Sequence, residues 1–212
     1  AFPAGPGASD FVVSLVWAAK GLSHQSVVVF FVLSGYLIGG GVMTQAQADR
    51  RFFGRYLIDR TARIYIVLVP ALLLTAALDA LGPALFGKVG LYGLDRYRGG
   101  AGPVDFLGNL ANLQDIYVPV FGSNGPLWSL SHEYWYYLTF GLVGVWMCAG
   151  YARPVRTAAF VAALASLAFT GLTPGYHLFG FLVWLAGAAA ARLNRPSPTA
   201  PRFALAVFLA AA

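Results

Sequence analysis

Glu133 is the residue whose type and position most strongly suggest chemistry, and it is the only glutamate in the sequence. It lies in Gly125-Pro-Leu-Trp-Ser-Leu-Ser-His-Glu-Tyr-Trp-Tyr-Tyr137, a segment that predicts a helix with Pro126 at its first position. Glu133 then lies about 10 Å along that helix, since a helix rises about 1.5 Å per residue. An ionisable group at such a depth in a bilayer costs on the order of 3 kcal/mol, so it should face a protein interior and have a partner.

Helical spacing decides which neighbours can act with Glu133. Ser129 and His132 share its face, whereas Ser131, two positions before it, points nearly opposite. The alternative is an aromatic belt that anchors the helix at the membrane surface. A belt needs no buried acid, so Glu133 favours the functional interpretation. The aromatic residues that fit a belt are Trp128, Tyr134, Trp135, Tyr136 and Tyr137.

Two further histidines precede apolar segments. His24 is predicted to lie at the same membrane face as Glu133, where a histidine and a carboxylate suggest a general base with its orienting group. The alternative is a structural histidine at the membrane surface. Ser34 and Gly35, in the following apolar segment, are expected to allow close helix packing. His177 has no neighbour in the sequence that recommends it.

Arg60 and Arg63, one helical turn apart, suggest a clamp for phosphate or pyrophosphate, because each guanidinium offers a planar fork of donors. The alternative is that they only mark membrane topology. The sequence has no Gly-rich phosphate loop, zinc-ligand spacing or Gly-x-Ser-x-Gly elbow, so P-loop, metallohydrolase and serine-hydrolase mechanisms have no support and no metal site is expected.

The composition identifies the elements that must position these residues. The chain has 212 residues, of which 58% are hydrophobic and only 10% charged, whereas a soluble domain is roughly a quarter charged. The apolar residues form blocks of about 18, the length that a membrane helix requires. One cysteine, Cys148, excludes an intrachain disulfide. We therefore expect an all-α, polytopic transmembrane helical bundle.

The predicted spans number about five, with a sixth beginning near Arg202. The region 11–22 is expected to be a separate helix lying on the membrane surface. The region 104–118, apolar but interrupted by polar residues, could be a re-entrant or interfacial helix. The predicted complete spans are 25–43, 64–81, 126–150, 157–172 and 176–191.

The net charge of +6 could suggest a nucleic-acid partner, but the basic residues fall between apolar blocks. Five arginines lie within residues 50–63, and placing this segment in the cytoplasm puts ten of the fourteen basic residues inside. We therefore interpret the charge as a topology signal, expect no nucleic acid as partner, and place His24, Glu133 and the long 82–125 connection outside.

Three segments, in order, resemble the membrane-bound acyltransferase-3 family. They are Phe30-Phe-Val-Leu-Ser-Gly-Tyr-Leu-Ile38, Arg60-Thr-Ala-Arg-Ile-Tyr65 and Asn124-Gly-Pro-Leu-Trp-Ser-Leu-Ser-His-Glu-Tyr-Trp-Tyr-Tyr137. The resemblance covers residues 23 to about 150 by motif and the later spans by general character. Three ordered motifs at the family's usual separations are more specific than any one of them.

This resemblance implies an inner-membrane enzyme of about ten helices. Such an enzyme moves an acyl group, commonly acetyl, from acyl-CoA to a hydroxyl of a surface or exported glycan or a related acceptor. It implies no bound cofactor, since acyl-CoA is a co-substrate. The family's Ser-x-Glu signature matches Ser131 and Glu133, and its arginines suited to the CoA phosphates match Arg60 and Arg63. The predicted site comprises catalytic Glu133, Ser131 and His24, donor-binding Arg60 and Arg63, and substrate-binding Asn124, Trp128 and His132.

One element of the family pattern is missing. On the helix before the Phe-Phe-x-x-Ser-Gly segment, the family carries a basic residue followed eleven positions later by a catalytic histidine. The eleventh position after Lys20 is Phe31. We therefore expect residues 1–212 to be a single partial acyltransferase domain, inactive as a fragment. The alternative function is a transporter or permease for a glycan or small metabolite, although the sequence has no internal repeat of the kind common in transporters.

Overall fold

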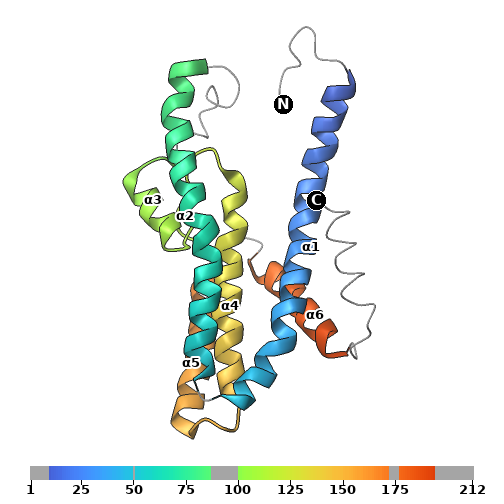
Figure 1. Cartoon of the computed structure of the whole chain (residues 1–212), viewed down its shortest axis with the longest axis vertical. Coiled ribbons are helices and arrows are strands. Elements are labelled where there is room, and N and C mark those ends of the chain that lie inside the picture. Colours follow the sequence, from blue (N-terminus) through green and yellow to red (C-terminus); the bar gives the residue numbers. More distant parts are fainter. Residues whose placement is uncertain (1–9, 50, 87–99, 172–176, 194–212) are drawn as a thin grey trace. The chain divides into compact units, whose positions relative to one another are not determined.

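The computed structural model describes residues 10–49, 51–86, 100–171 and 177–193. Within these ranges the regular structure is helical, with one isolated bridge between Gln114 and Val118. The prediction of an all-α fold is therefore confirmed for the described part of the chain. The elements are α1 (Asp10–Ala48), α2 (Phe52–Phe86), α3 (Pro103–Leu110), the short 3-10 helix η3 (Gly125–Leu127), α4 (Trp128–Met147), α5 (Arg153–Gly171) and α6 (His177–Leu193) (Figure 1).

Three segments are long and apolar enough to cross a membrane by length and composition, among the described residues: Gln25–Ala48, Phe52–Gly82 and Arg153–Gly171. The remaining predicted spans correspond to α4 and α6. Helix α6 has 17 residues, or about 26 Å, slightly less than the 30 Å hydrocarbon core. Helix α4 has 20 residues, but it includes polar side chains that the protein itself buries. Five complete spans remain a prediction.

Two predicted boundaries are wrong. Residues 11–22 are not a separate helix but the beginning of α1, which continues to Ala48. Helix α2 begins at Phe52, so Arg55, Arg60 and Arg63 lie on the helix and not in a loop before it. Both errors have one cause, because hydropathy marks the apolar part of a helix, whereas helical structure continues through polar residues of good helix propensity.

The chain divides into two compact units, residues 1–41 with 180–212, and residues 42–179. In the first unit, α1 and α6 approach so closely that a side chain at Gly35 would collide with the backbone of Trp184. The indole of Trp184 is fully buried and donates a hydrogen bond to the Ser34 hydroxyl at 3.2 Å. The predicted role of Ser34 and Gly35 in close helix packing is confirmed.

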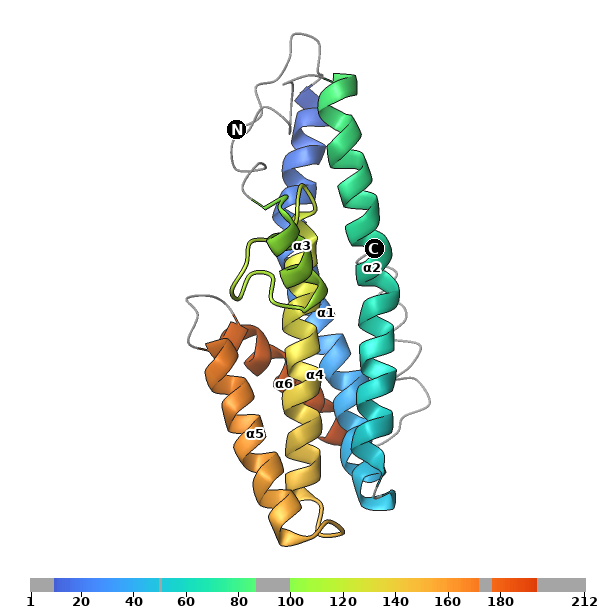
Figure 2. The same cartoon turned by 90° about the vertical axis from the view of Figure 1, so that its left-hand side faces the viewer.

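The second unit contains α2, α3, α4 and α5. Helix α4 lies between α2 and α5, and it runs opposite to both (Figure 2). One end of this unit carries Arg51, Arg55, Arg153 and Arg156, and we call it the arginine end. There the Tyr151 hydroxyl, between α4 and α5, donates a hydrogen bond of 3.5 Å to the backbone oxygen of Asp49, which follows α1. We call the opposite end, formed by residues 100–127 and the first turn of α4, the loop end (Figures 1 and 2).

The loop end is built on α3, whose first turn is capped by the Asp105 carboxylate accepting from the backbone N–H of Gly102 at 3.0 Å. The short helix within the predicted 104–118 region is thus present. The loop that follows is held to α2 by Asp79, which accepts hydrogen bonds from the N–H and the hydroxyl of Ser123, both at 2.7 Å. Gly122 next to it has a φ of 60°, and a side chain there would collide with Asp79.

Candidate functional site

Glu133 is 3% exposed, in the second turn of α4. The hydroxyl of Tyr137, one turn further along α4, donates a hydrogen bond to Oε1 of Glu133. The expectation that this carboxyl group faces the protein interior and has a partner is therefore confirmed. One partner is the uncharged Tyr137 hydroxyl at i+4, a position that helix geometry brings to the same face.

Helix α2 brings Tyr56 and Arg60 to the same region. The Tyr56 hydroxyl donates a hydrogen bond to the backbone oxygen of Tyr137 at 3.0 Å, and the guanidinium carbon of Arg60 lies 5.8 Å from the centre of the Tyr56 ring. The Nε atom of Arg60 is buried and has no hydrogen-bond partner within the part of the chain described. We call Tyr56, Arg60, Glu133 and Tyr137 the Glu133 cluster.

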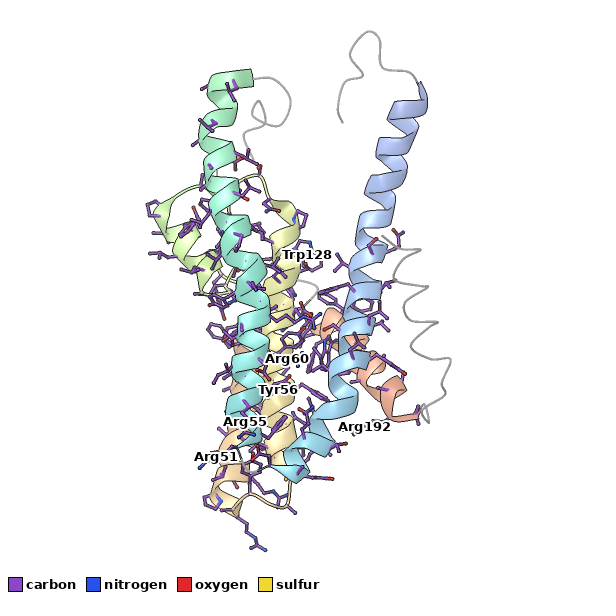
Figure 3. The ribbon with its side chains drawn as sticks, in the orientation of Figure 1. Arg51, Arg55, Tyr56, Arg60, Trp128 and Arg192 are labelled. Atoms are coloured by element: carbon purple, nitrogen blue, oxygen red, sulfur yellow. The ribbon has the colours of Figure 1, made fainter. Side chains whose placement is uncertain are left out.

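Antiparallel packing explains how Arg60 reaches this depth. The Tyr56 ring lies against Gly141, where a Cβ would lie 2.6 Å from its Cε1 atom. One turn towards the loop end, α2 carries Arg60 and α4 carries Tyr137, and one turn adds about 6 Å along either helix. Arg60 is therefore level with Tyr137, about one and a half turns above the exposed Arg55 that pairs with Asp49 at 3.0 Å. Figure 3 shows Arg51, Arg55 and Arg60 at increasing distance from the arginine end.

This arrangement combines a buried carboxyl group with a cation whose buried Nε atom has no acceptor among the described residues. A guanidinium stacked over an aromatic ring keeps its donors in a plane and available for an anionic ligand. Arg63, the other predicted donor-binding residue, is exposed on α2. The described residues do not bring Arg63 into the Glu133 cluster.

Ser131 points away from Glu133, as its spacing predicts. Its hydroxyl donates a hydrogen bond to the backbone oxygen of Asn112 at 3.1 Å, and the Trp135 indole donates to the same oxygen at 2.8 Å. Asn112 has a φ of 56°, a left-handed conformation that asparagine tolerates better than most residues. In this structure Ser131 holds the loop to α4, while its catalytic role stays a prediction.

His132 belongs to a second group at the loop end. Its Nε2 atom lies 3.2 Å from Oδ2 of Asp115, and its Nδ1 atom lies 3.2 Å from Nδ1 of His177. Both histidines are buried, at 2% and 3% exposure. The sequence gives no reason to single out His177, but the structure places His132 beside it. The two histidines are 45 residues apart, and the only signal that could have joined them is their predicted location at one membrane face.

The remaining predicted substrate-binding residues also lie at the loop end. Asn124 donates through its side-chain amide to the Thr75 hydroxyl at 3.1 Å, so it ties the loop to α2. The Trp128 ring lies edge-on to the His132 ring, with centroids 5.3 Å apart. The Ser129 hydroxyl donates a hydrogen bond to the Pro126 carbonyl of η3, 3.0 Å away. The side chain of His24, in α1, lies outside the described residues.

Comparison with known proteins identifies the family of the chain. The family model for an acyltransferase domain matches residues 1–212, the acyltransferase-3 family. The match covers more than half of the chain, and the chain belongs to this family. It is thus an acyltransferase-type membrane protein with three helices apolar enough to span a bilayer in its described part. No curated protein and no solved structure matches the chain.

Proposed function

We propose that the chain is an integral membrane O-acyltransferase. In this proposal it moves an acyl group, acetyl in the first instance, from acyl-CoA to a hydroxyl of an extracytoplasmic carbohydrate or related acceptor. The supporting observation is the Glu133 cluster, which combines a buried carboxyl group with a half-buried guanidinium whose Nε atom has no hydrogen-bond partner among the described residues, within an acyltransferase-3 domain. A purely structural helix bundle would have little reason to keep the Nε atom of Arg60 buried without a partner, because burying an unpaired polar group is costly.

The donor is assigned to the arginines of α2. Acyl-CoA carries phosphate and pyrophosphate groups, which a planar guanidinium binds through paired hydrogen bonds. The proposed orientation puts the arginine end in the cytoplasm, where acyl-CoA is made, because basic residues concentrate on that side of membrane proteins. Arg60 and Arg63 then hold the phosphates, and the acyl-bearing arm extends towards Glu133.

The reaction has simple requirements. A base takes the proton from the acceptor hydroxyl, its oxygen bonds to the acyl carbon, the carbon–sulfur bond breaks, and the CoA thiolate leaves and takes a proton from solvent. We assign the base to a histidine, with His24 as the sequence candidate, and retain Glu133 and Ser131 as the residues of the family signature. Asn124, Trp128 and His132, at the loop end, are assigned to the acceptor.

The same proposal includes the membrane environment of the chain. The chain is placed in the bacterial inner membrane as a multi-pass protein, with about five spans of a bundle of about ten helices and the lipid bilayer as its partner. The exposed apolar side chains of α2 and α5 support lipid contact, since few soluble proteins expose so many (Ile66, Leu73, Leu74, Leu78, Val161 and Leu164). Acyl-CoA is a co-substrate, so no resident cofactor is part of the proposal.

The test uses the full-length protein in membrane vesicles with acetyl-CoA labelled in its acetyl group. We expect label to reach the glycan fraction as a base-labile ester, and Glu133→Gln to abolish the transfer while insertion is retained. Asp105→Asn is the matched control, a carboxylate of the same unit that only caps α3. Wild-type transfer by Glu133→Gln would remove Glu133 from the mechanism. If the wild-type protein did not consume acetyl-CoA but carried a glycan across the vesicle membrane, the result would instead indicate a permease.

A further inference from the structure

The loop end carries exposed aromatic rings that the proposed site does not use. Tyr117, in the loop after α3, and Phe169, two residues before the end of α5, are 51% and 40% exposed. Their ring centroids lie 4.7 Å apart, and the Trp135 ring of α4 lies 5.1 Å from the Phe169 ring. We call Tyr117, Trp135 and Phe169 the aromatic patch.

The polar atoms of this patch are directed to the protein. The Tyr117 hydroxyl donates a hydrogen bond to the backbone oxygen of Phe169, and the Trp135 indole donates to the backbone oxygen of Asn112 at 2.8 Å. In an aromatic belt at a membrane surface, the polar ends of such side chains reach water and the lipid headgroups. Here both polar ends are bonded to backbone oxygens, so the parts left for contact with another molecule are the rings themselves.

The same hydrogen bonds hold the rings in place. The Asn112 oxygen that accepts from Trp135 also accepts from the Ser131 hydroxyl at 3.1 Å, and the Asn112 amide donates to the Tyr65 hydroxyl of α2 at 3.2 Å. The loop is thereby bonded to α2 and α4, and through Tyr117 to α5. A binding surface that is fixed before the ligand arrives loses little conformational entropy on binding.

An acidic side chain accompanies the patch. Asp115 belongs to the same tight turn as Tyr117, in which the N–H of Asp115 donates to the oxygen of Val118 at 2.9 Å. Its side chain is 49% exposed, and Oδ2 lies 3.2 Å from Nε2 of His132. Among the described residues, Oδ1 of Asp115 has no hydrogen-bond partner. Because the proposed function assigns His132 to the acceptor, this contact joins Asp115 to the acceptor side of the site.

The patch and the carboxylate together match the chemistry of an uncharged sugar. The face of an aromatic ring carries partial negative charge, so it attracts the weakly positive C–H groups on one face of a pyranose ring. A carboxylate accepts hydrogen bonds from hydroxyl groups, and such bonds are about twice as strong as neutral ones. The same carboxylate repels phosphate and uronic acid groups. The combination therefore favours a neutral polyhydroxyl ring over an anion.

We propose that the aromatic patch and Asp115 bind one uncharged pyranose ring of the acceptor glycan. This rests on the proposed function and names the substrate class at its acceptor side. The sugar stacks on Tyr117 and Phe169, and its hydroxyls donate to Asp115. Phe169 lies near the end of a segment apolar enough to cross a membrane, so the bound sugar lies at the membrane surface on the side opposite the arginine end.

The first measurement is independent of acyl transfer. Saturation-transfer difference NMR of the full-length protein in nanodiscs, with methyl β-D-glucopyranoside as the probe, should show contact through its ring C–H protons. Phe169→Leu keeps an apolar side chain but removes the ring, and should weaken binding about three- to tenfold. Phe160→Leu is the matched control, because Phe160 is an exposed ring of the same helix that packs against Trp146. Tyr117→Phe, which keeps the ring, should bind the probe, whereas Tyr117→Leu should bind it as weakly as Phe169→Leu.

A second probe tests the charge. Methyl β-D-glucopyranosiduronate has a carboxylate where the first probe has a hydroxymethyl group, and it should bind at least about threefold more weakly because Asp115 repels it. Asp115→Asn should remove most of the difference between the two probes. Asp105→Asn, a carboxylate that caps α3, should leave the difference as in the wild type.

Two results overturn the sugar site. One is equal binding of the first probe by the wild type, Phe169→Leu and empty nanodiscs, and the other is equal binding of the two probes by the wild type. If the patch contacts lipid instead, the probe does not bind, and lipids labelled with a quencher reduce the part of the fluorescence that Trp135→Phe removes.

Acetyl transfer from labelled acetyl-CoA separates this site from the proposed function. Sugar binding by a wild-type protein that transfers no acetyl group overturns the proposed function and leaves the sugar site. Transfer by Phe169→Leu with the rate and the acceptor requirement of the wild type overturns the sugar site and leaves the proposed function.

Discussion

The Tyr56 hydroxyl donates a hydrogen bond to the backbone oxygen of Tyr137, 3.0 Å away, across the interface of α2 and α4. This bond joins the helix that carries the arginines to the helix that carries the buried glutamate. It is possible because Gly141 leaves room for the Tyr56 ring. The position of Arg60 relative to Glu133 along the helix axes therefore depends on the contact between Tyr56 and Tyr137.

Gly141→Ala is expected to disturb the Glu133 cluster from outside it. The new methyl group would lie 2.6 Å from Cε1 of Tyr56, so the ring must move and Arg60 with it. We expect a loss of about 1–3 kcal/mol in stability, the usual cost of overpacking, and weaker use of acetyl-CoA. Thermal unfolding and donor titration in detergent measure both. Gly54→Ala is the control, because a Cβ there has nothing within 4 Å; equal effects of both changes would contradict the contact.

Tyr137→Phe removes the hydroxyl that donates to Glu133. A buried carboxyl group that loses a donor is destabilised by about 1–3 kcal/mol, and its orientation is no longer fixed. We expect a fall of roughly tenfold or more in acetyl transfer with the helices still inserted. Tyr151→Phe, which removes a hydroxyl that contacts the backbone of Asp49 and Phe53 at the arginine end, should retain the wild-type rate. Tyr137→Phe with unchanged transfer would mean that Glu133 needs no donor from α4.

Arg60→Ala is expected to raise the acetyl-CoA concentration needed for half-maximal transfer, because its guanidinium is assigned to the donor phosphates. Arg60→Lys should recover only part of the effect, since an ammonium cannot form the paired bonds of a guanidinium. Arg55→Ala is the matched control, because Arg55 is exposed and paired with Asp49. If Arg55→Ala and Arg60→Ala raise the acetyl-CoA concentration for half-maximal transfer equally, Arg60 contributes only to the net positive charge or the membrane topology and does not form a binding site.

Local helix geometry explains which parts of the site could be predicted. The burial of Glu133 and the opposite direction of Ser131 both follow from a 3.6-residue repeat in one helix, and both are confirmed. The family assignment was also available from ordered motifs. These are properties of contiguous segments, which a sequence displays directly.

Tertiary contacts explain the rest. Nothing near His177 in the sequence indicates His132 as its partner, because the contact depends on how α6 begins beside α4. In the same way, Asn124 was assigned to substrate from its motif, while its amide is engaged with Thr75 on α2. Hydropathy placed the apolar segments but not the helix ends, since α1 and α2 both extend through polar residues.

Asp79→Asn tests how the loop end is held. Asp79 accepts two hydrogen bonds from Ser123, and an amide can replace only one of the two carboxylate oxygens as acceptor. The amide oxygen can then accept from the N–H of Ser123 while the amide NH2 donates to the Ser123 hydroxyl, so two hydrogen bonds to an ionised group become neutral ones, at a cost of about 1–2 kcal/mol. Because a local contact limits local opening, hydrogen exchange in residues 100–127 should become at least about tenfold faster, while exchange in α5 stays unchanged. Asp59→Asn, an exposed position on the same helix, should leave both regions as in the wild type. Faster exchange throughout α2, α4 and α5 would instead show that Asp79 stabilises the whole unit, and that the loop end does not open on its own.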